Sequence, residues 1–225
     1  MPEGFHPPLE EYLETIYALE EEHVPVIQAR LVERLGHTPQ AVSEMIRRLS
    51  DEGYVGRAGR GLELTEKGHH RAESVVRKHR IAERFLVDVV GLPWYEAHHE
   101  AGRWEHVISD EVEARFVAIL NNPTTCPHGN PIPGTARDPA PQQPLNEIAA
   151  GTPITLARIT ELVEFDRDAL VYLSDHGVVP GRKGRIRSRA PDGTLTLELD
   201  EAGAATPRTV AIGPTLSGQL FATTA

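Results

Sequence analysis

A proline-rich stretch divides the chain into two parts with different hydrophobic patterns. Seven prolines fall between residues 123 and 144, in a segment with little apolar content. Before it, apolar residues recur at helical spacing, and after it short alternating segments such as 154–158 and 195–199 predict β-strands. We therefore predict a mainly α-helical chain with a small β-barrel domain at the C-terminus. We expect the proline-rich segment to be a partly extended linker.

The first 68 residues have the pattern of a winged helix-turn-helix. A helix is predicted from residue 8 onward, and a second from 27 to 35, where Gly36 stops it. Thr38 is suited to cap a third helix that ends near Gly53, and two short strands around a glycine-rich turn follow. The third helix is the expected recognition helix. The residues predicted to contact DNA lie on its polar side and in the wing: Thr38, Pro39, Gln40, Ser43, Arg47, Arg57 and Arg60.

The charge distribution favours site-specific DNA binding. The formal net charge of the 225 residues is −10, which argues against general coating of nucleic acid. Between residues 34 and 60, however, five arginines stand against three acidic residues. A local positive surface on a negative protein suits operator recognition. The alternative is a helix-turn-helix that serves as a protein–protein scaffold.

Histidines and carboxylates occur at metal-ligand spacing in the helical part. One pair is i,i+4 on a long predicted helix, a second group follows on the next helix, and two glutamates lie on the first helix. The i,i+4 pair is His79 and Glu83. The group on the next helix is His98, Glu105 and His106, and the glutamates on the first helix are Glu11 and Glu14. This mixture of nitrogen and oxygen donors suits a divalent first-row metal. His69, His70, His99 and His128 are expected at the surface or in turns.

The composition excludes several other classes of protein. The single cysteine, Cys126, rules out an internal disulfide framework and a Cys-rich zinc site, and we interpret it as a bystander. No apolar run approaches the roughly 18 residues of a membrane span. The N-terminus has neither a basic region nor an apolar core of a leader, so we expect a cytoplasmic protein without a membrane partner.

Four blocks of sequence resemble the diphtheria toxin repressor family of metal-activated transcriptional regulators. They are EEYLETIYALEEE (10–22), VRKHRIAERFL (76–86), HHEAGRWEHVISDEVE (98–113) and GNPIPG (129–134). The resemblance covers nearly the whole chain. It implies a winged-helix domain (1–72), a helical dimerisation and metal-binding domain (73–123), a proline-rich linker (124–148) and an SH3-like, FeoA-like barrel (149–225).

The resemblance also implies two metal sites per chain. An ancillary site would use His79, Glu83 and His98. An activating site would use Glu105, His106, a first-helix position held here by Glu11, and the position of Gly102.

The chain departs from the iron-sensing pattern at two of these positions. Glu11 stands where iron-sensing relatives have methionine, and Gly102, which offers only its backbone carbonyl, stands where they have cysteine. Glu14 matches a further carboxylate of manganese-type relatives. Mn²⁺ is therefore the expected metal, with Fe²⁺ as the alternative.

In the longer members of the family that the chain resembles, side chains from the barrel complete the ancillary site. Asp166 aligns with the family carboxylate that reaches this metal. The companion amide position is Ala169, which cannot bind a metal, and Glu164 is a substitute ligand.

The expected function is a metal-activated repressor that binds palindromic operator DNA as a homodimer, is not an enzyme and has no small organic substrate. Two other classes of protein are alternatives. A helical-bundle metalloenzyme would need two Glu-x-x-His pairs, for which Glu96–His99 and Glu66–His69 are the matches. A constitutive DNA-binding protein would use its histidines only structurally.

Overall fold

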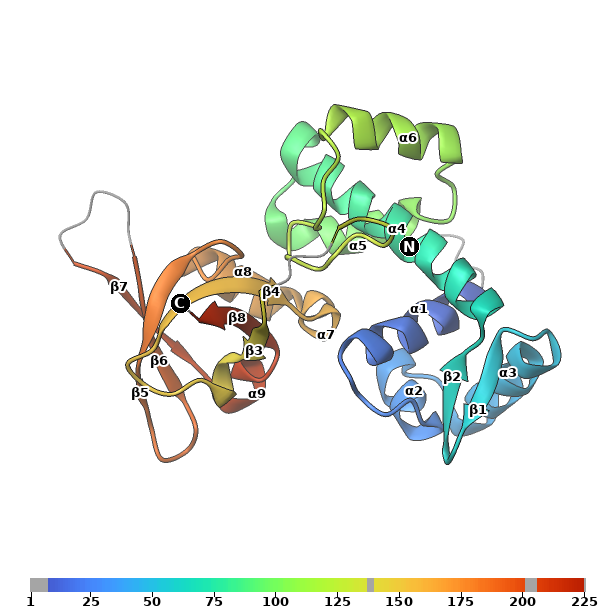
Figure 1. The fold of residues 1–225 in the computed structure, drawn as a ribbon, viewed down its shortest axis with the longest axis horizontal. Coiled ribbons are helices and arrows are strands. Elements are labelled where there is room, and N and C mark those ends of the chain that lie inside the picture. The colour runs from blue at the N-terminus through green and yellow to red at the C-terminus, as the bar shows by residue number, and fades with distance from the viewer. Residues whose placement is uncertain (1–7, 137–139, 201–205, 225) are drawn as a thin grey trace. The chain divides into compact units, whose positions relative to one another are not determined.

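The computed structural model describes residues 8–136, 140–200 and 206–224, and the chain divides into two compact units (Figure 1). Among the described residues, the first unit takes 8–85, 100–122 and 132–134, and the second takes 86–99, 123–131 and most of the chain from 135 onward. The winged helix and most of the helical segment after it thus share one unit. The proline-rich segment contributes residues to both units. The bounds of the four domains stay a prediction.

The first unit begins with a winged helix-turn-helix, as predicted. Its elements are α1 (Pro8–Glu21), α2 (Gln28–Leu35), α3 (Pro39–Asp51), β1 (Val55–Ala58) and β2 (Gly61–Leu64). Thr38 caps α3, because its hydroxyl accepts a hydrogen bond from the Ala41 backbone N–H at 3.2 Å. β1 and β2 pair antiparallel around a two-residue loop in which Gly59 has a φ of +60°, a conformation that favours glycine.

The long helix α4 (Glu66–Phe85) and the helix α6 (Asp110–Ile119) complete the first unit. Between them, α5 (Ala97–Trp104) passes from the second unit into the first along the chain. The core gathers on one face of α1, where Leu13, Ile16 and Leu19 are fully buried. Leu31 of α2 and Leu49 of α3 are buried in the same cluster. Burial of this face fixes α1 against the helices that follow it.

The second unit contains a six-stranded antiparallel sheet in the order β3-β8-β4-β5-β6-β7. The strands are β3 (Gln142–Pro144), β4 (Pro153–Ile159), β5 (Lys183–Arg189), β6 (Leu195–Leu199), β7 (Arg208–Ile212) and β8 (Leu220–Thr224). In the described part of the chain β3 and β7 do not pair, so the sheet is open where a closed barrel was expected.

Short helices complete the second unit. They are the π-helical turn η1 (Leu86–Val90), the 3₁₀ turns η2 (Trp94–Glu96) and η3 (Leu145–Glu147), and the α-helices α7 (Glu161–Glu164), α8 (Arg167–Asp175) and α9 (Pro214–Ser217). The core combines inward strand residues such as Ile186 and Leu197 with Leu170 and Leu173 of α8. None of the helices in the described ranges is long and apolar enough to cross a membrane.

The proline-rich segment contributes ordered, buried turns. Residues 126–130 are all buried, and Thr125 and Pro131 form an isolated antiparallel bridge. The Pro133 carbonyl accepts a hydrogen bond from Arg77 of α4 at 2.7 Å. Prolines here fix tight turns against packed structure, which composition alone does not distinguish from a solvated linker.

Candidate metal centre and DNA-reading surface

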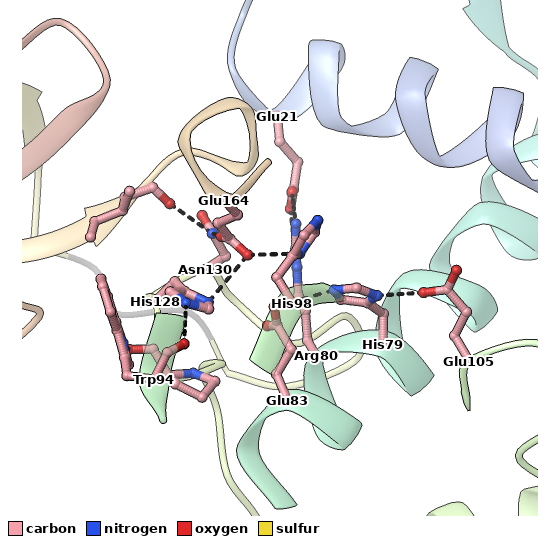
Figure 2. Close-up of polar contacts among 12 residues, drawn as sticks. Glu21, His79, Arg80, Glu83, Trp94, His98, Glu105, His128, Asn130 and Glu164 are labelled. Atoms are coloured by element: carbon pink, nitrogen blue, oxygen red, sulfur yellow. Dashed lines mark hydrogen bonds and ion pairs between the residues drawn. The ribbon is translucent and has the colours of Figure 1, made fainter. Parts of the chain in front are cut away.

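His79 lies between two carboxylates in the first unit. It belongs to α4, one helical turn before Glu83, and Glu105 follows the end of α5. Its Nε2 is 3.2 Å from Oε1 of Glu83, and its Nδ1 contacts the Glu105 carboxylate directly (Figure 2). The side chains of Glu83 and Glu105 are 1% and 5% exposed. This is a buried set of nitrogen and oxygen donors.

The pKa values in this cluster depend on burial and on the charges of neighbouring side chains. Burial by itself lowers the pKa of His79, but Glu105 and Glu83 outweigh it and hold that pKa well above its usual value. Burial raises the pKa of Glu105, but His79 and His106 overcome it and bring that pKa down to about 2. Glu105 is therefore a carboxylate at neutral pH, which is the form that binds metal ions.

His106 joins the same carboxylate to the first helix. Its Nε2 is 3.0 Å from Oε1 of Glu105, and its Nδ1 is 2.5 Å from Oε2 of Glu10 on α1. Glu10 is buried and also pairs with Arg71 of α4. Potential ligand atoms of Glu14, Glu105 and His106 all lie within 4.8 Å of one another. The predicted residues Glu14, Glu105 and His106 are therefore brought together.

The structure places Glu10, not Glu11, against His106. Glu10 and Glu14 are one turn apart on the same face of α1, whereas Glu11 is rotated about 100° from Glu10. Glu11 is only half-buried, and within the described part of the chain its side chain forms no hydrogen bond or ion pair with this set. Gly102 lies in the last turn of α5, where backbone carbonyls lack helical partners. Sequence reasoning missed Glu10, although its i,i+4 spacing to Glu14 was a visible signal.

A second cluster forms around Glu164 in the second unit. Oε2 of Glu164 is 3.1 Å from Nδ1 of His98 and 3.2 Å from Nδ1 of His128, and Oε1 accepts a hydrogen bond from Asn130 at 2.5 Å (Figure 2). His128 is fully buried and Glu164 is 6% exposed. Sγ of Cys126 lies within 4.8 Å of a ring nitrogen of His128. Two imidazoles, a carboxylate and a thiol are thus gathered here.

Three sequence expectations are corrected by this cluster. His128 is not a surface residue, and Cys126, 1% exposed, is not an isolated bystander. Asp166 is exposed, and its carboxylate caps α8 by accepting from the Ala169 backbone N–H at 3.0 Å. Glu164 is the acid that the fold places beside His98. The Cys-x-His spacing at 126–128 was the signal available, but the surrounding prolines suggested a linker.

Gly129 holds the loop that carries Cys126 and His128. Its φ is +89°, and a Cβ at this position would lie 2.1 Å from the Ala157 carbonyl oxygen on β4. Only glycine permits both this conformation and this approach. The backbone N–H of Ile159 donates to the His128 carbonyl at 2.9 Å, which fixes the loop further.

The predicted ancillary ligands divide between the two units. His79 and Glu83 lie in the first unit and His98 lies in the second. Both clusters offer imidazole nitrogens and carboxylate oxygens, and the second adds a thiol. These donors fit divalent first-row metals. The donor chemistry therefore agrees with the metal that the resemblance implies.

The exposed side of α3 carries the predicted DNA-reading residues. Gln40, Ser43 and Arg47 are exposed there, and Val42 and Leu49 are buried on the opposite side. Their spacing of three and four residues forms one stripe along the helix. The Thr38 hydroxyl is occupied by its capping bond.

The wing presents two further cations. Arg57 is exposed on β1, and Arg60 is exposed in the loop to β2. Arg47, Arg57 and Arg60 make no ion pair within the described ranges, whereas Arg48 pairs with Glu52 at 2.7 Å. Unpaired cations beside an exposed helical stripe suit phosphate contact on both sides of a major groove.

The chain matches two family descriptions over more than half its length. Residues 5–61 match "Iron dependent repressor, N-terminal DNA binding domain", and residues 65–134 match "Iron dependent repressor, metal binding and dimerisation domain". The iron-dependent repressor IdeR of Mycobacterium tuberculosis is 48% identical over 202 residues, covering 84% of this chain and 87% of that protein. The diphtheria toxin repressor of Corynebacterium diphtheriae is 39% identical over 198 residues, with coverage of 84% and 87%.

Solved structures agree with these relatives. A manganese-dependent transcriptional repressor in complex with manganese is 31% identical, with a TM-score of 0.86 over 96% of this chain and all of that one. The IdeR of T. acidophilum is 26% identical, with a TM-score of 0.79 over 99% of this chain. The relatives are described as repressors, so the metalloenzyme alternative is set aside. The chain belongs to the diphtheria toxin repressor and IdeR family of metal-dependent, DNA-binding transcriptional repressors.

Proposed function

We propose that this chain is a Mn²⁺-activated repressor of metal-ion homeostasis genes that binds palindromic operators as a homodimer. The observation that carries the choice of metal is the set around Glu105, which contains carboxylates and imidazoles and no sulfur. Such a set favours Mn²⁺ over softer metals. Fe²⁺ is the second candidate, because the IdeR relatives are iron-dependent and Cys126 adds a thiol to the second cluster.

The activating ion would be held by Glu14, Glu105 and His106, with Glu10 as a further carboxylate at His106. When bound, the cation supplies positive charge that draws these carboxylates together. Glu10 acts on the imidazole by accepting at Nδ1, which directs Nε2 toward Glu105. Arg71 holds Glu10 in turn.

α1 connects this set to the DNA-reading elements. Glu20, near its end, accepts a hydrogen bond from the Leu64 backbone N–H of β2 at 3.1 Å, and Glu21 pairs with buried Arg80 of α4 at 2.6 Å. Its middle residues Leu13 and Ile16 pack in the core shared with α3. His106 contacts Glu10, so residues 105–106 are linked to α1, and α1 sets the position of the wing and of the recognition helix. An effector works by favouring the DNA-competent arrangement over others.

Exposed apolar residues of the first unit supply the proposed dimer surface. Val107 is 71% exposed, and Val112 and Ile119 of α6 are 41% and 59% exposed. In the same unit, the rings of Phe85 of α4 and Phe116 of α6 stack on each other, with centroids 4.1 Å apart. Exposed apolar residues of this kind suit a two-fold contact. Leu86, by contrast, is buried within its own chain.

The function is tested by titrating chelator-treated protein with Mn²⁺ and, anaerobically, with Fe²⁺. The probe is a fluorescent palindromic duplex enriched from a random-sequence library with both metals present, and anisotropy reports binding. We expect binding that requires metal and reaches half-saturation at lower Mn²⁺ than Fe²⁺. An equal or stronger response to Fe²⁺ would overturn the choice of Mn²⁺. Binding unaffected by chelator would overturn metal activation itself.

The second cluster leads to a separate prediction about stoichiometry. Glu164→Gln removes the negative charge that His98 and His128 both face, so we expect the second Mn²⁺ per chain to be lost or bound at least roughly tenfold more weakly. Asp166→Asn is the matched control, because asparagine also caps a helix and Asp166 lies off the cluster. Equilibrium dialysis with metal analysis counts the bound ions. Two ions at unchanged affinity in Glu164→Gln would refute the assignment.

A further inference from the structure

The sheet of the second unit carries a concentration of positive charge that the metal and operator sites do not use. Residues 176–191 contain five cations and no acidic residue, in a chain of net charge −10. The four neighbouring strands β4 to β7 together contain six cations and one acid, Glu198. Charge of one sign on a single sheet is the electrostatic footprint of a polyanion partner.

Three of these cations lie on the outward face of β5. Ile186 is fully buried in the core, so Lys183, Arg185 and Arg187 alternate with it and point away from it. Their side chains are exposed, with values of 60% for Arg185 and 58% for Arg187. Lys183 and Arg185 are alternate residues of the strand, about 6.6 Å apart. Arg187 lies at a bulge between Ile186 and Ser188, and it reaches the same Glu198 carboxylate as Arg185. We call Lys183, Arg185 and Arg187 the β5 stripe.

The stripe keeps an excess of positive charge after its internal pairing. Arg185 and Arg187 share one carboxylate, that of Glu198 on β6, at 2.5 Å and 3.4 Å. Lys183 makes no ion pair among the residues that the structure describes. The residues that flank the stripe across β4 are Pro153 and Thr155, which are uncharged. On the other side, Asp200 follows β6 and lies across from Lys183, where its backbone N–H donates to the Lys183 carbonyl at 2.8 Å. One net positive charge therefore remains on this face.

The other three cations of these strands have structural roles. Arg158 lies over the Phe221 ring, 4.1 Å from its centroid. Arg189 donates to the Asn146 carbonyl at 2.6 Å, and Arg208 donates to the Asp175 carbonyl at 2.8 Å. The structure thus separates cations that hold the fold from the stripe, which is exposed.

We propose that the β5 stripe is a second, sequence-independent DNA contact of this repressor, in which the three side chains meet backbone phosphates. The stripe is a row of exposed cations along one strand, which suits an extended polyanion better than a small ligand. DNA is the polyanion we favour, because the family binds it and this unit is covalently joined to the DNA-binding unit. The proposal rests on DNA binding by the family and not on the identity of the metal.

The test compares full-length variants on a fluorescent 60-bp duplex of mixed sequence with chelator present, at several KCl concentrations. Lys183→Gln with Arg187→Gln removes two phosphate contacts per chain. It should therefore lower the magnitude of the log K against log salt slope by about 2 and the affinity roughly 10- to 60-fold at about 0.1 M salt. Lys183→Arg with Arg187→Lys keeps the charge and should keep the affinity.

Arg167→Gln with Arg208→Gln is the matched control. It removes the same charge from the same unit but off the stripe, and thermal melting of each variant confirms the fold. Equal slopes in wild type, stripe variant and control would overturn the proposal. So would equal losses in both double variants, because net charge alone would then explain them. Loss of binding to polyglutamate with an unchanged DNA slope would also overturn it and identify a protein-binding surface.

Discussion

Replacing His106 by alanine is expected to abolish metal-dependent operator binding, with a loss of at least about 100-fold in Mn²⁺ affinity. The imidazole is the group that joins Glu10 of α1 to Glu105, at 2.5 Å and 3.0 Å. Without the imidazole, the buried carboxylates of Glu10 and Glu105 lose the group that joins them, and the metal site has one ligand fewer. Isothermal titration with Mn²⁺ measures the affinity, and anisotropy on the operator duplex measures the consequence for DNA.

Two further variants sharpen that result. His70→Ala removes an exposed histidine of α4 and should change neither measurement. Glu10→Gln leaves the imidazole in place but weakens its orientation, so an intermediate loss of about 10- to 100-fold is expected. Unchanged Mn²⁺ affinity in His106→Ala, with the fold intact, would remove this cluster as the activating site.

Replacing Arg47 by alanine should weaken operator binding about 10- to 100-fold at saturating metal, while Mn²⁺ affinity stays unchanged. Arg47 is exposed on the same stripe of α3 as Gln40 and Ser43, and it makes no ion pair within the described ranges. Its guanidinium is therefore available to a base edge or a phosphate. Anisotropy on the operator duplex and on a scrambled duplex distinguishes a base contact from a phosphate contact, because loss of a base contact weakens binding to the operator only.

The adjacent Arg48 provides the control for that measurement. It pairs with Glu52 in the next turn and is rotated away from the Gln40–Arg47 stripe. Arg48→Ala removes the same charge and should change operator affinity far less than Arg47→Ala. Equal losses in the two variants would mean that α3 contributes only general positive charge and does not read the operator.

The winged helix could be predicted from sequence because its signals are local. Thr38 followed by Pro39 marks the start of α3, and the Gly59 turn marks the hairpin, as the structure confirms. Periodicity also identified α1 and most of the C-terminal strands. The short edge strand β3 and the last strand β8 were missed, because neither has a pattern that distinguishes a strand from a loop.

The metal clusters were predictable only in part, because their members meet through tertiary packing. His79 and Glu83 share one helix, so spacing revealed them. Glu10 and Glu164 approach their histidines from distant elements. Adjacent residues of a helix point in different directions, so the sequence indicated Glu11 where the structure places Glu10. Cys126 was misread because burial of a proline-rich loop depends on what it packs against.

The two ion pairs at the ends of α1 have a mechanical consequence. Glu10 pairs with Arg71 and Glu21 with Arg80, so both ends of this helix are fastened to α4. A helix of 14 residues is a stiff rod of about 21 Å. Pinned at two points, such a rod cannot bend locally to accommodate a new ligand at one end. A shift imposed near Glu10 would therefore move α1 and α4 together, and it would reach the wing at the other end of α1, about two nanometres away.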